Sequence, residues 1–227
     1  MKIDTSTETG TERRTLTRQR VLEAAVALAD RDGIEAVSMR RLGQELGIEA
    51  MSLYTHVRSK EDLLAGMVDL VIGQIPTRRG RRNGGDWKTT LRRTVQSARS
   101  VMLRHPWAPR VIEDLPDPGP SGLRYYDTVM GILREGGFSL EVTHHAVHLF
   151  GSRLLGFSQD LFDDSPNPDP SANAMLAEQL GATHPYVAEM ALAATHDGAL
   201  GGCDDDLEFA IALDVILDGL ERLKDRG

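Results

Sequence analysis

The apolar residues of this chain recur every three or four positions, and no segment alternates apolar and polar residues as a half-buried strand does. Val21, Ala24 and Leu28 follow this spacing near the N-terminus, and Leu213 and Leu220 follow it near the C-terminus. Such spacing places apolar side chains on one side of a helix. The sequence therefore predicts an all-α protein, and 227 residues allow a large buried core.

Helix caps and glycines divide the first 75 residues into four predicted helices. Ser38 and Ser59 have the side chain of an N-cap, and Asp62 completes a capping-box pattern with Ser59. Gly33 and Gly47 can adopt the positive φ that ends a helix. The predicted helices run from Thr17 to Asp32, Met39 to Leu46, Ala50 to Val57 and Lys60 to Ile75, before Pro76.

Residues 76–86, PTRRGRRNGGD, are rich in Gly, Pro and Arg, which predicts a linker between two domains. Helical periodicity then resumes, with breaks at Gly136-Gly137 and at the three prolines of DDSPNPDPS. The helix near the C-terminus carries apolar residues on more than one side, so part of it is expected to meet another subunit. The predicted helices are 87–104, 122–135, 139–162, 171–180, 185–195 and 206–224.

The charge of the chain is unevenly distributed. The net charge is −8, but residues 1–60 hold 10 Lys and Arg against 9 Asp and Glu, whereas residues 111–227 hold 6 against 21. The acidic excess therefore lies away from the N-terminal helices. No run of 18 apolar residues and no signal peptide is found, and the single Cys203 cannot form an internal disulfide. We therefore expect a cytoplasmic protein without a membrane partner.

Two short helices joined by a glycine turn and braced by an earlier helix form a helix-turn-helix, which presents its second helix to the major groove of DNA. Here the second helix is 50–57, and only Leu53 and Val57 face inward. Met51 can contact a thymine methyl, and hydroxyls and cations at helix starts can contact phosphates. The residues expected to contact DNA are Thr17, Ser38, Arg40, Glu49, Met51, Ser52, Tyr54, His56 and Lys60.

The segment from Leu16 to Leu64, LTRQRVLEAAVALADRDGIEAVSMRRLGQELGIEAMSLYTHVRSKEDLL, resembles the DNA-binding domain of the tetracycline repressor (TetR) family. GIEAVSMRRLGQELGI and SLYTHVRSKEDLL carry most of the likeness. The resemblance implies a three-helix domain followed by a linking helix, with residues 49–56 on the DNA-reading helix. The chain departs from the tetracycline repressors at Ala50-Met51, where those proteins carry a base-reading polar residue and a proline.

The rest of the chain is similar, more loosely, to the C-terminal domain of the tetracycline repressors. The likeness lies in RHPW at 104–107, in LREGGF at 133–138, and in a long helix followed by a Pro-rich loop. It implies a homodimer whose long and final helices form a four-helix bundle, and a near-palindromic operator. It also implies a small-molecule effector and no obligatory cofactor.

Aromatic and polarizable residues on the C-terminal helices are candidates for an effector cavity, although a helical core contains the same residue types. The residues expected to contact the effector are Met102, His105, Trp107, Tyr125, Tyr126, Met130, His148, Phe150 and Phe157. His144 and His148 are four residues apart, a spacing that suits a metal, but no carboxylate stands at a confirming offset. No metal site is therefore assigned.

Two charged runs have a simpler interpretation than a binding site. The arginines at 78, 79, 81 and 82 can touch DNA, but a basic run of this kind is more typical of a solvated linker. Asp204–Asp206 are expected at the N-terminus of the final helix, where the helix dipole favours acidic side chains, rather than in a calcium loop.

These features predict a DNA-binding transcriptional regulator, a repressor that a small effector releases from its operator, with the fourth helix as the lever. The predicted division is an N-terminal arm at 1–14, a DNA-binding domain at 15–75, a linker at 76–86, and an effector-binding and dimerisation domain at 87–227. Two other classes of protein are possible alternatives. The first is an enzyme, but the sequence contains no nucleophile elbow, phosphate loop or metalloprotease motif. An architectural DNA-binding protein would bind without responding to an effector.

Overall fold

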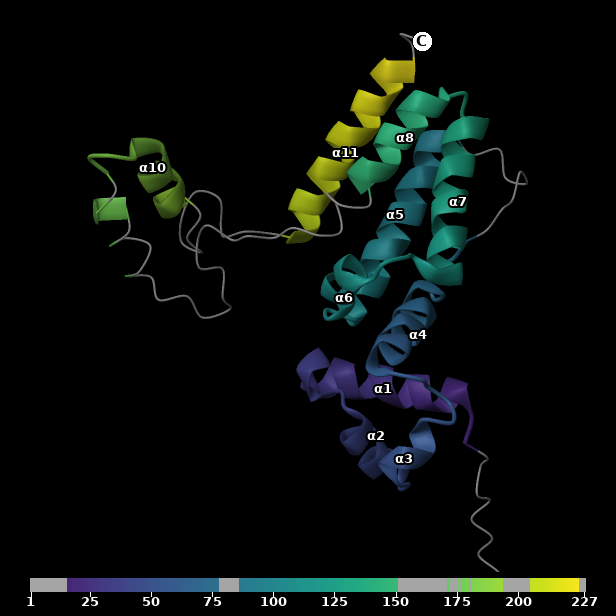
Figure 1. Cartoon of the computed structure of the whole chain (residues 1–227). Coiled ribbons are helices and arrows are strands. Elements are labelled where there is room, and N and C mark those ends of the chain that lie inside the picture. The colour runs from purple at the N-terminus through teal and green to yellow at the C-terminus, as the bar shows by residue number, and fades with distance from the viewer. Residues whose placement is uncertain are drawn as a thin grey trace, which may run out of the picture. The chain divides into compact units, whose positions relative to one another are not determined.

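The computed structural model describes residues 16–77, 86–150, 171, 175, 177–179, 181–193 and 205–224. In this part of the chain the regular secondary structure is helical and contains no strand, which confirms the all-α fold (Figure 1). The chain forms two compact units: residues up to Thr77 with Ser97–Tyr125, and Arg78–Gln96 with Tyr126 onward. The predicted division at 76–86 stays a prediction, since residues 97–125 group with the N-terminal helices.

The first unit begins with α1 (Arg18–Asp32), whose bounds lie within one residue of those predicted. The Thr17 side chain accepts a hydrogen bond from the backbone N–H of Arg20, and the backbone N–H of Gly33 donates to the carbonyl of Ala29. A short 3-10 turn, η1 (Ile34–Ala36), follows. The next helix, α2 (Met39–Leu46), has the predicted bounds, because Ser38 caps its start and Gly47 ends it with φ 66° and ψ 33°.

The linking helix α4 (Lys60–Ile72) is shorter than predicted. The chain turns at Gly73–Ile75 instead of continuing to Pro76. Proline disfavours the helical conformation of the residue before it, and Gly73 has a low helix propensity, so the last turn is lost. The expected cap is present: the Ser59 hydroxyl oxygen accepts from the backbone N–H of Asp62 at 3.1 Å.

Helix α6 (Ala108–Asp114) was not predicted from the sequence. It is short, and Pro109 stands in its first turn, where proline is tolerated because the N–H is unpaired there in any helix. It contacts α4 within the first unit. A proline in the first turn also explains why α7 (Gly119–Glu135) begins three residues before its predicted start at Gly122.

The core of the first unit is formed by the helices that contact one another, α1 with α2 and α4, and α2 with α3 (Figure 1). Figure 1 shows α1 lying across α4, with α2 and the short α3 on the other side of α1. Removing these apolar side chains from water stabilises the unit. The buried residues include Val21, Ala25, Leu28, Leu42, Leu53, Val57, Leu63, Met67 and Val71.

The second unit joins the start of α5 (Trp87–Arg104) to the end of α7. The rings of Trp87 and Phe138 meet edge to face with centroids 4.6 Å apart. Gly136 lies against Trp87: a Cβ there would stand 2.9 Å from the Cβ of Trp87. Gly136 is therefore needed for this close approach, and Gly137, with φ 89°, turns the chain into the next helix.

Helices α8 (Leu140–His148) and α11 (Asp205–Lys224) contact each other in the second unit. Ser139, the first residue of the predicted segment 139–162, caps α8, and Leu149 and Phe150 continue with π-helical geometry. The rest of that segment lies outside the described residues. Lys88 of α5 pairs with Asp218 and Glu221 of α11 at 2.6 and 2.8 Å, and these carboxylates raise the pKa of Lys88. These pairs fix α11 against α5.

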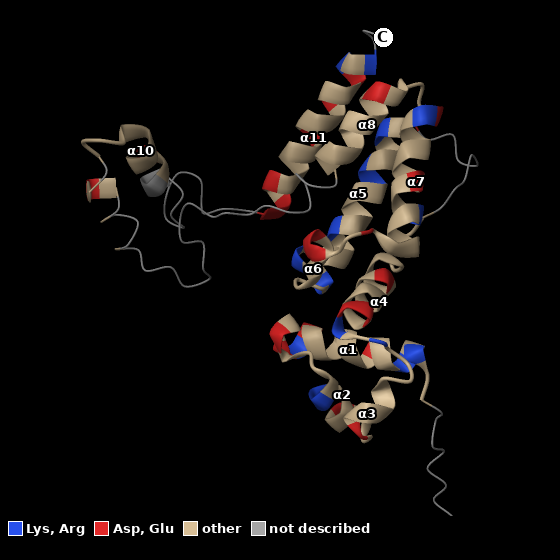
Figure 2. Ribbon diagram, viewed as in Figure 1, with Lys and Arg blue, Asp and Glu red and all other residues tan. Residues whose placement is uncertain are grey.

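Acidic residues lie in the first turn of α11 and basic residues in its last turn (Figure 2). Asp205 and Asp206 stand in the first turn and Lys224 in the last, which complements the helix dipole and agrees with the expected role of the acidic run. Helix α10 (Pro185–Ala193) starts where predicted, and the last two residues of its predicted range lie outside the described residues. None of the described helices is long and apolar enough to cross a bilayer.

Candidate DNA-binding interface

The helix predicted to read DNA, α3 (Ala50–Leu53), has one buried and one exposed side. Leu53 and Val57 are 0% exposed, and they anchor the segment to the core. Met51 and Tyr54, by contrast, are 73% and 46% exposed. Large side chains that are open to solvent on a segment held by two buried anchors can contact another molecule without disturbing the fold.

Helix α3 ends at Leu53 and not at Val57 as predicted. The backbone N–H groups of His56 and Val57 both donate to the carbonyl of Leu53, at 2.8 and 3.0 Å, so the chain turns. The Thr55 hydroxyl donates to the carbonyl of Ser52 at 2.7 Å, a local bond that competes with a longer helix. Tyr54, Thr55 and His56 therefore stand on a turn, and α3 itself presents Met51 and Ser52.

Two of the predicted DNA-contacting hydroxyls also cap helices. The oxygens of Thr17 and Ser38 accept from the backbone N–H groups of Arg20 and Arg41, both at 3.2 Å. A hydroxyl that accepts in this way keeps its own O–H to donate. Because both hydroxyls stand at exposed helix starts, they can still donate to a phosphate oxygen.

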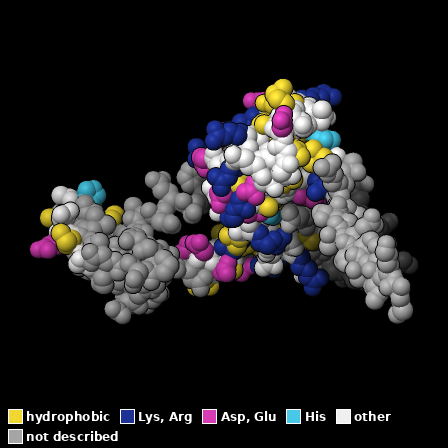
Figure 3. All heavy atoms as spheres, turned by 90° about the horizontal axis from the view of Figure 1, so that it is seen from below, with side chains coloured by type: hydrophobic (Ala, Val, Ile, Leu, Met, Phe, Trp, Pro, Cys, Tyr) yellow, Lys and Arg dark blue, Asp and Glu magenta, His cyan; other side chains and the backbone are white. Residues whose placement is uncertain are grey.

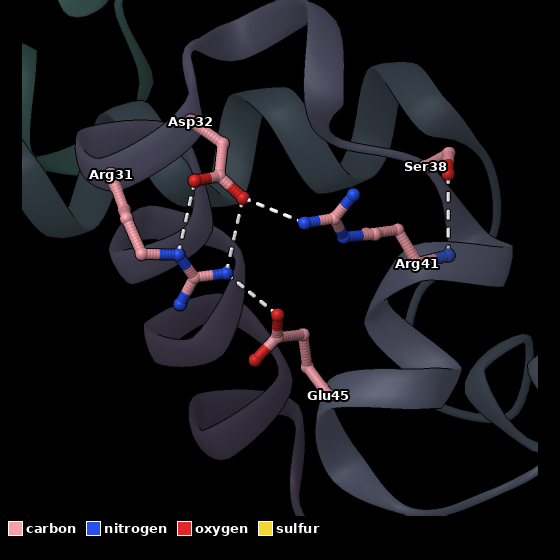
Figure 4. A network of polar contacts seen from close by, with 5 residues as sticks. All are labelled: Arg31, Asp32, Ser38, Arg41 and Glu45. Carbon is pink, nitrogen blue, oxygen red and sulfur yellow. Dashed lines mark hydrogen bonds and ion pairs between the residues drawn. The ribbon is translucent and has the colours of Figure 1, made fainter.

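Ion pairs fix α2 to the end of α1 (Figure 4). Arg31 lies 3.1 Å from Asp32 and 2.6 Å from Glu45, and Arg41 lies 2.8 Å from the other oxygen of Asp32. Hydrogen bonding to Arg31 is the largest cause that lowers the pKa of Asp32. These two arginines are therefore occupied by carboxylates of the protein itself.

A second ion pair holds the far end of the DNA-reading segment. Arg18 donates to both oxygens of Asp62, at 2.7 and 2.8 Å, and also to the carbonyl of His56 at 2.8 Å. Asp62 accepts from the backbone N–H of Arg58 at 2.8 Å instead of closing the predicted capping box with Ser59. The bond from Arg18, followed by that from Arg58, lowers the pKa of Asp62 from 3.8 to about 2. This cluster fixes the backbone between His56 and Arg58.

The ion pairs within the N-terminal helices leave a small set of cationic side chains that can contact DNA. Within residues 16–77, Arg40, Arg58 and Lys60 are exposed and have no carboxylate at ion-pair distance, whereas Arg18, Arg31 and Arg41 do. Figure 3 views the molecule from the side of α2 and α3 and shows Lys and Arg side chains, with Asp and Glu side chains among them, around a surface that is mostly uncharged. Cations that flank an uncharged centre suit phosphate contacts on either side of base contacts.

Comparison with known proteins agrees with this geometry. Residues 21–67 match the model of the bacterial regulatory proteins of the tetR family, and residues 79–223 match the tetracyclin repressor-like C-terminal domain. The chain is 32% identical over 216 residues to the HTH-type transcriptional repressor DrrR1 of Streptomyces coeruleorubidus, covering 92% of this chain and 78% of DrrR1. The chain belongs to the TetR family.

Other TetR family proteins show the same likeness. The tetracycline repressor protein class D of Escherichia coli is 31% identical over 176 residues, which cover 73% of this chain and 78% of that protein. The apo crystal structure of ActR from Streptomyces coelicolor superposes with a TM-score of 0.72 and 25% identity, over 93% of this chain and 97% of ActR. These relatives are transcriptional regulators, so the alternative that this chain is an enzyme is wrong.

The residues expected to contact an effector are divided between the two units. Met102, His105, Trp107 and Tyr125 belong to the first unit, and each is 7% exposed. In the second unit Phe150 is buried, Tyr126 is half-buried, and Met130 and His148 are exposed; Phe157 lies outside the described residues. His105 and Trp107 come together beside Asp30, with ring centroids 6.3 Å apart. The role of the whole set stays a prediction.

The possible metal site also stays untested. The rings of His144 and His148 lie 4.7 Å apart between centroids, on the exposed side of α8. Across the described residues no group of three or more His, Cys, Asp or Glu side chains is placed to hold a metal ion. The arginines at 78–82 lie outside the described residues.

Sequence reasoning missed the residues that position the interface. Arg18 and Asp62 are 44 residues apart, and Arg31 and Glu45 are 14 apart, so no local pattern joins them. The sequence explains Asp62 without a partner, because an acidic residue is favoured in the first turn of any helix. Only the folded unit brings Asp62 to Arg18 of α1.

Proposed function

We propose that this TetR family protein is a homodimeric repressor that a small-molecule effector releases from a near-palindromic operator. The observation that carries the proposal is the pairing, on one short segment, of fully buried Leu53 and Val57 with exposed Met51 and Tyr54. Such a segment is anchored firmly and still open to a major groove. We propose the cytoplasm as the place where it meets DNA.

The proposed base contacts come from Met51 and Ser52, with Glu49 beside them, because these residues are exposed and lie at the start of α3. The proposed phosphate contacts come from residues that flank α3. They are Thr17, Ser38, Arg40, Tyr54, His56, Arg58 and Lys60. These latter contacts would set the register of the protein on the duplex without reading the sequence.

A homodimer is supported by apolar side chains that α11 leaves uncovered. Leu207, Ile211 and Val215 are 57%, 54% and 63% exposed, and they recur every four residues along the helix. Leu140 of α8, the neighbour of α11, is 73% exposed. A two-fold dimer formed through these helices would cover them, and its two-fold symmetry would match the two half-sites of a near-palindromic operator.

A small-molecule effector is supported by the match to the tetracyclin repressor-like C-terminal domain. ActR, which is 26% identical to this chain, has been solved in complex with actinorhodin and with (S)-DNPA. We keep the sequence-based set as effector contacts, except for His105 and Trp107, whose ring nitrogens are occupied by other side chains. Two relatives are named as repressors, which supports the proposal that the effector releases this protein from DNA and does not promote its binding.

The test begins with a duplex that the full-length protein selects from a random-sequence library. Fluorescence anisotropy should give specific binding that weakens as salt is raised. Lys60→Ala should weaken binding to all sequences alike and reduce the salt slope by about 1, whereas Ser52→Ala should reduce the preference for the selected sequence. Gln19→Ala, an exposed change on α1 outside the interface, is the matched control.

The effector is tested on the same complex, with actinorhodin as the first probe and a panel of small aromatic molecules after it. Release of the duplex, with affinity lowered at least about tenfold, supports the proposal; such a shift corresponds to about 1.4 kcal/mol. Binding that depends on salt and on no member of the panel would favour an architectural DNA-binding protein. Failure of the selection to yield any preferred sequence would contradict the proposed function itself.

A further inference from the structure

The carboxylate of Asp30, near the end of α1, accepts two N–H groups from the segment that joins α5 to α6. Its Oδ1 atom lies 2.7 Å from Nε1 of Trp107 and 2.8 Å from Nδ1 of His105. Both rings are 7% exposed, and they stand 75 and 77 residues further along the chain. A charged acceptor with two ring N–H donors is a strong and directional contact.

The other side of the His105 ring faces Gln74. Nε2 of His105 lies 3.1 Å from the amide nitrogen of Gln74 and 3.4 Å from its Oε1, and Arg104 donates to the same Oε1 at 3.2 Å. Nδ1, on the opposite side of the ring, faces Asp30. Four side chains thus form one chain of hydrogen bonds from the turn after α4 to α1.

The two residues that follow Asp30 point to α2 instead. Arg31 pairs with Glu45, and Asp32 pairs with Arg41 (Figure 4). The last turn of α1 therefore contacts the α5–α6 segment through Asp30 and contacts α2 through its next two residues. A movement of the α5–α6 segment would reach α2, and with it α3, through this single turn.

We propose that Asp30 is a positioning residue that couples the α5–α6 segment to the DNA-reading helices through the end of α1, in addition to the route through α4. In this role His105 and Trp107 hold Asp30 and do not contact the effector. The inference rests on the proposed function, because it concerns how operator binding is controlled. It predicts that the α5–α6 segment and the helices α2 and α3 are coupled without a prior movement of α4.

Coupling between two sites is reciprocal, so it can be measured without the effector. If the state of the α5–α6 segment changes the affinity for DNA, then DNA bound at α2 and α3 must change the state of that segment. The readout is the hydrogen exchange of the backbone amides of α6, with and without a saturating duplex selected by the full-length wild-type chain. A residue with only a structural role would raise this exchange equally in both conditions.

In the wild-type protein the selected duplex should slow exchange in α6 by at least about fivefold, the lower end of typical coupling. Asp30→Ala removes the acceptor and should reduce this DNA-induced change to less than about twofold. Amides of α2 and α3 should still be protected by the duplex in that variant. Asp30→Asn keeps an oxygen at the same place and should restore at least about half of the change.

Two further variants keep the test decisive if Asp30→Ala folds poorly. Trp107→Phe removes one N–H donor and keeps an aromatic ring, so it should lower the change in α6 without unfolding the unit. Glu35→Gln is the matched control, because it breaks the exposed 3.9 Å pair with Arg110, which joins the same region of the chain to α6. It should behave as the wild type.

The outcomes separate the inference from the proposed function. Protection of α2 and α3 by the duplex, with no change in α6 of the wild type, would overturn the coupling and leave DNA binding intact. An undiminished change in α6 of both Asp30→Ala and Trp107→Phe would also overturn it. Absence of protection anywhere in the wild type would contradict the proposed function, and the inference with it.

Discussion

Asp62 shows how one side chain serves both the fold and the interface. It pairs with Arg18 of α1 and accepts from the backbone N–H of Arg58, so it fixes the point where the DNA-reading segment leaves the core. The pKa of Asp62 is lowered to about 2 by these partners. A carboxylate with a lowered pKa in the folded state adds stability at a pH above its unfolded value.

We predict that Asp62→Asn lowers the free energy of unfolding by about 1 kcal/mol at pH 7, a figure reduced from the full pKa shift because the pair is partly exposed. The stability that Asp62 adds is lost as pH falls through about 2, where the folded carboxylate takes up its proton. Urea unfolding at pH 7 and near pH 2 checks this. An equal difference between variant and wild type at both pH values would contradict it.

Met51 and Leu53 are two residues apart and have opposite surroundings, 73% and 0% exposed. Leu53→Ala opens a cavity in the core and should lower the free energy of unfolding by about 2–5 kcal/mol. Met51→Ala should leave stability within about 0.5 kcal/mol and weaken binding of the selected duplex. Denaturant unfolding and anisotropy on the same samples separate the two effects. A stability loss of similar size in both variants would show that Met51 packs inside the protein.

At the scale of elements, the angle between α2 and α3 depends on two glycines of different kinds. Gly47 has φ 66°, and a Cβ there would meet nothing within 4 Å, so only its backbone conformation requires glycine. Gly43 has ordinary helical geometry, but a Cβ there would lie 2.8 Å from the carbonyl oxygen of Ile48 and 3.1 Å from the nitrogen of Ala50. The backbones of α2 and α3 meet at Gly43.

We therefore predict that Gly43→Ala is the more damaging change, although Gly47 is the glycine that the sequence pattern emphasises. Gly47→Ala should cost about 1–2 kcal/mol of stability, the usual strain of a left-handed residue, and keep operator binding. Gly43→Ala must move α3 and should weaken operator binding at least about tenfold, or about 1.4 kcal/mol. Thermal unfolding and anisotropy measure both quantities; stronger binding loss in Gly47→Ala would reverse this ranking.

The elements also show what can be predicted from sequence. Caps such as Thr17, Ser38 and Ser139 act within four residues, so the starts of α1, α2 and α8 were predicted correctly. The C-terminal ends of helices were harder to predict than their starts, because the turn at Tyr54–His56 and the early end of α4 depend on competing local hydrogen bonds. Helix α6 was missed because seven residues are too few to show a period. The contact of Asp30 with Trp107 spans 77 residues and has no local signature.

At the scale of the whole molecule, the uncovered residues of α11 lead to a prediction about assembly. A charge at Ile211 or Val215 would be buried without a partner in a dimer formed through this helix, whereas in a monomer it would remain in water. Ile211→Glu with Val215→Glu should therefore shift the protein to a monomer in multi-angle light scattering and abolish binding to a palindromic duplex. Leu103→Glu on α5, at a residue that is 59% exposed, should remain dimeric. A dimeric double variant would place the subunit contact elsewhere.

The internal pairing of arginines on α1 and α2 has a consequence for how the protein searches a genome. Attraction to DNA of any sequence grows with the number of cations that displace counterions from the phosphates. Arg31 and Arg41 are neutralised by Asp32 and Glu45, and the chain as a whole carries a charge of −8. Among the described residues of the N-terminal helices, 16–77, few cations therefore remain for that general attraction. Residence on unrelated DNA should be brief, so that occupancy of the operator depends chiefly on the fit between base edges and the side chains of α3.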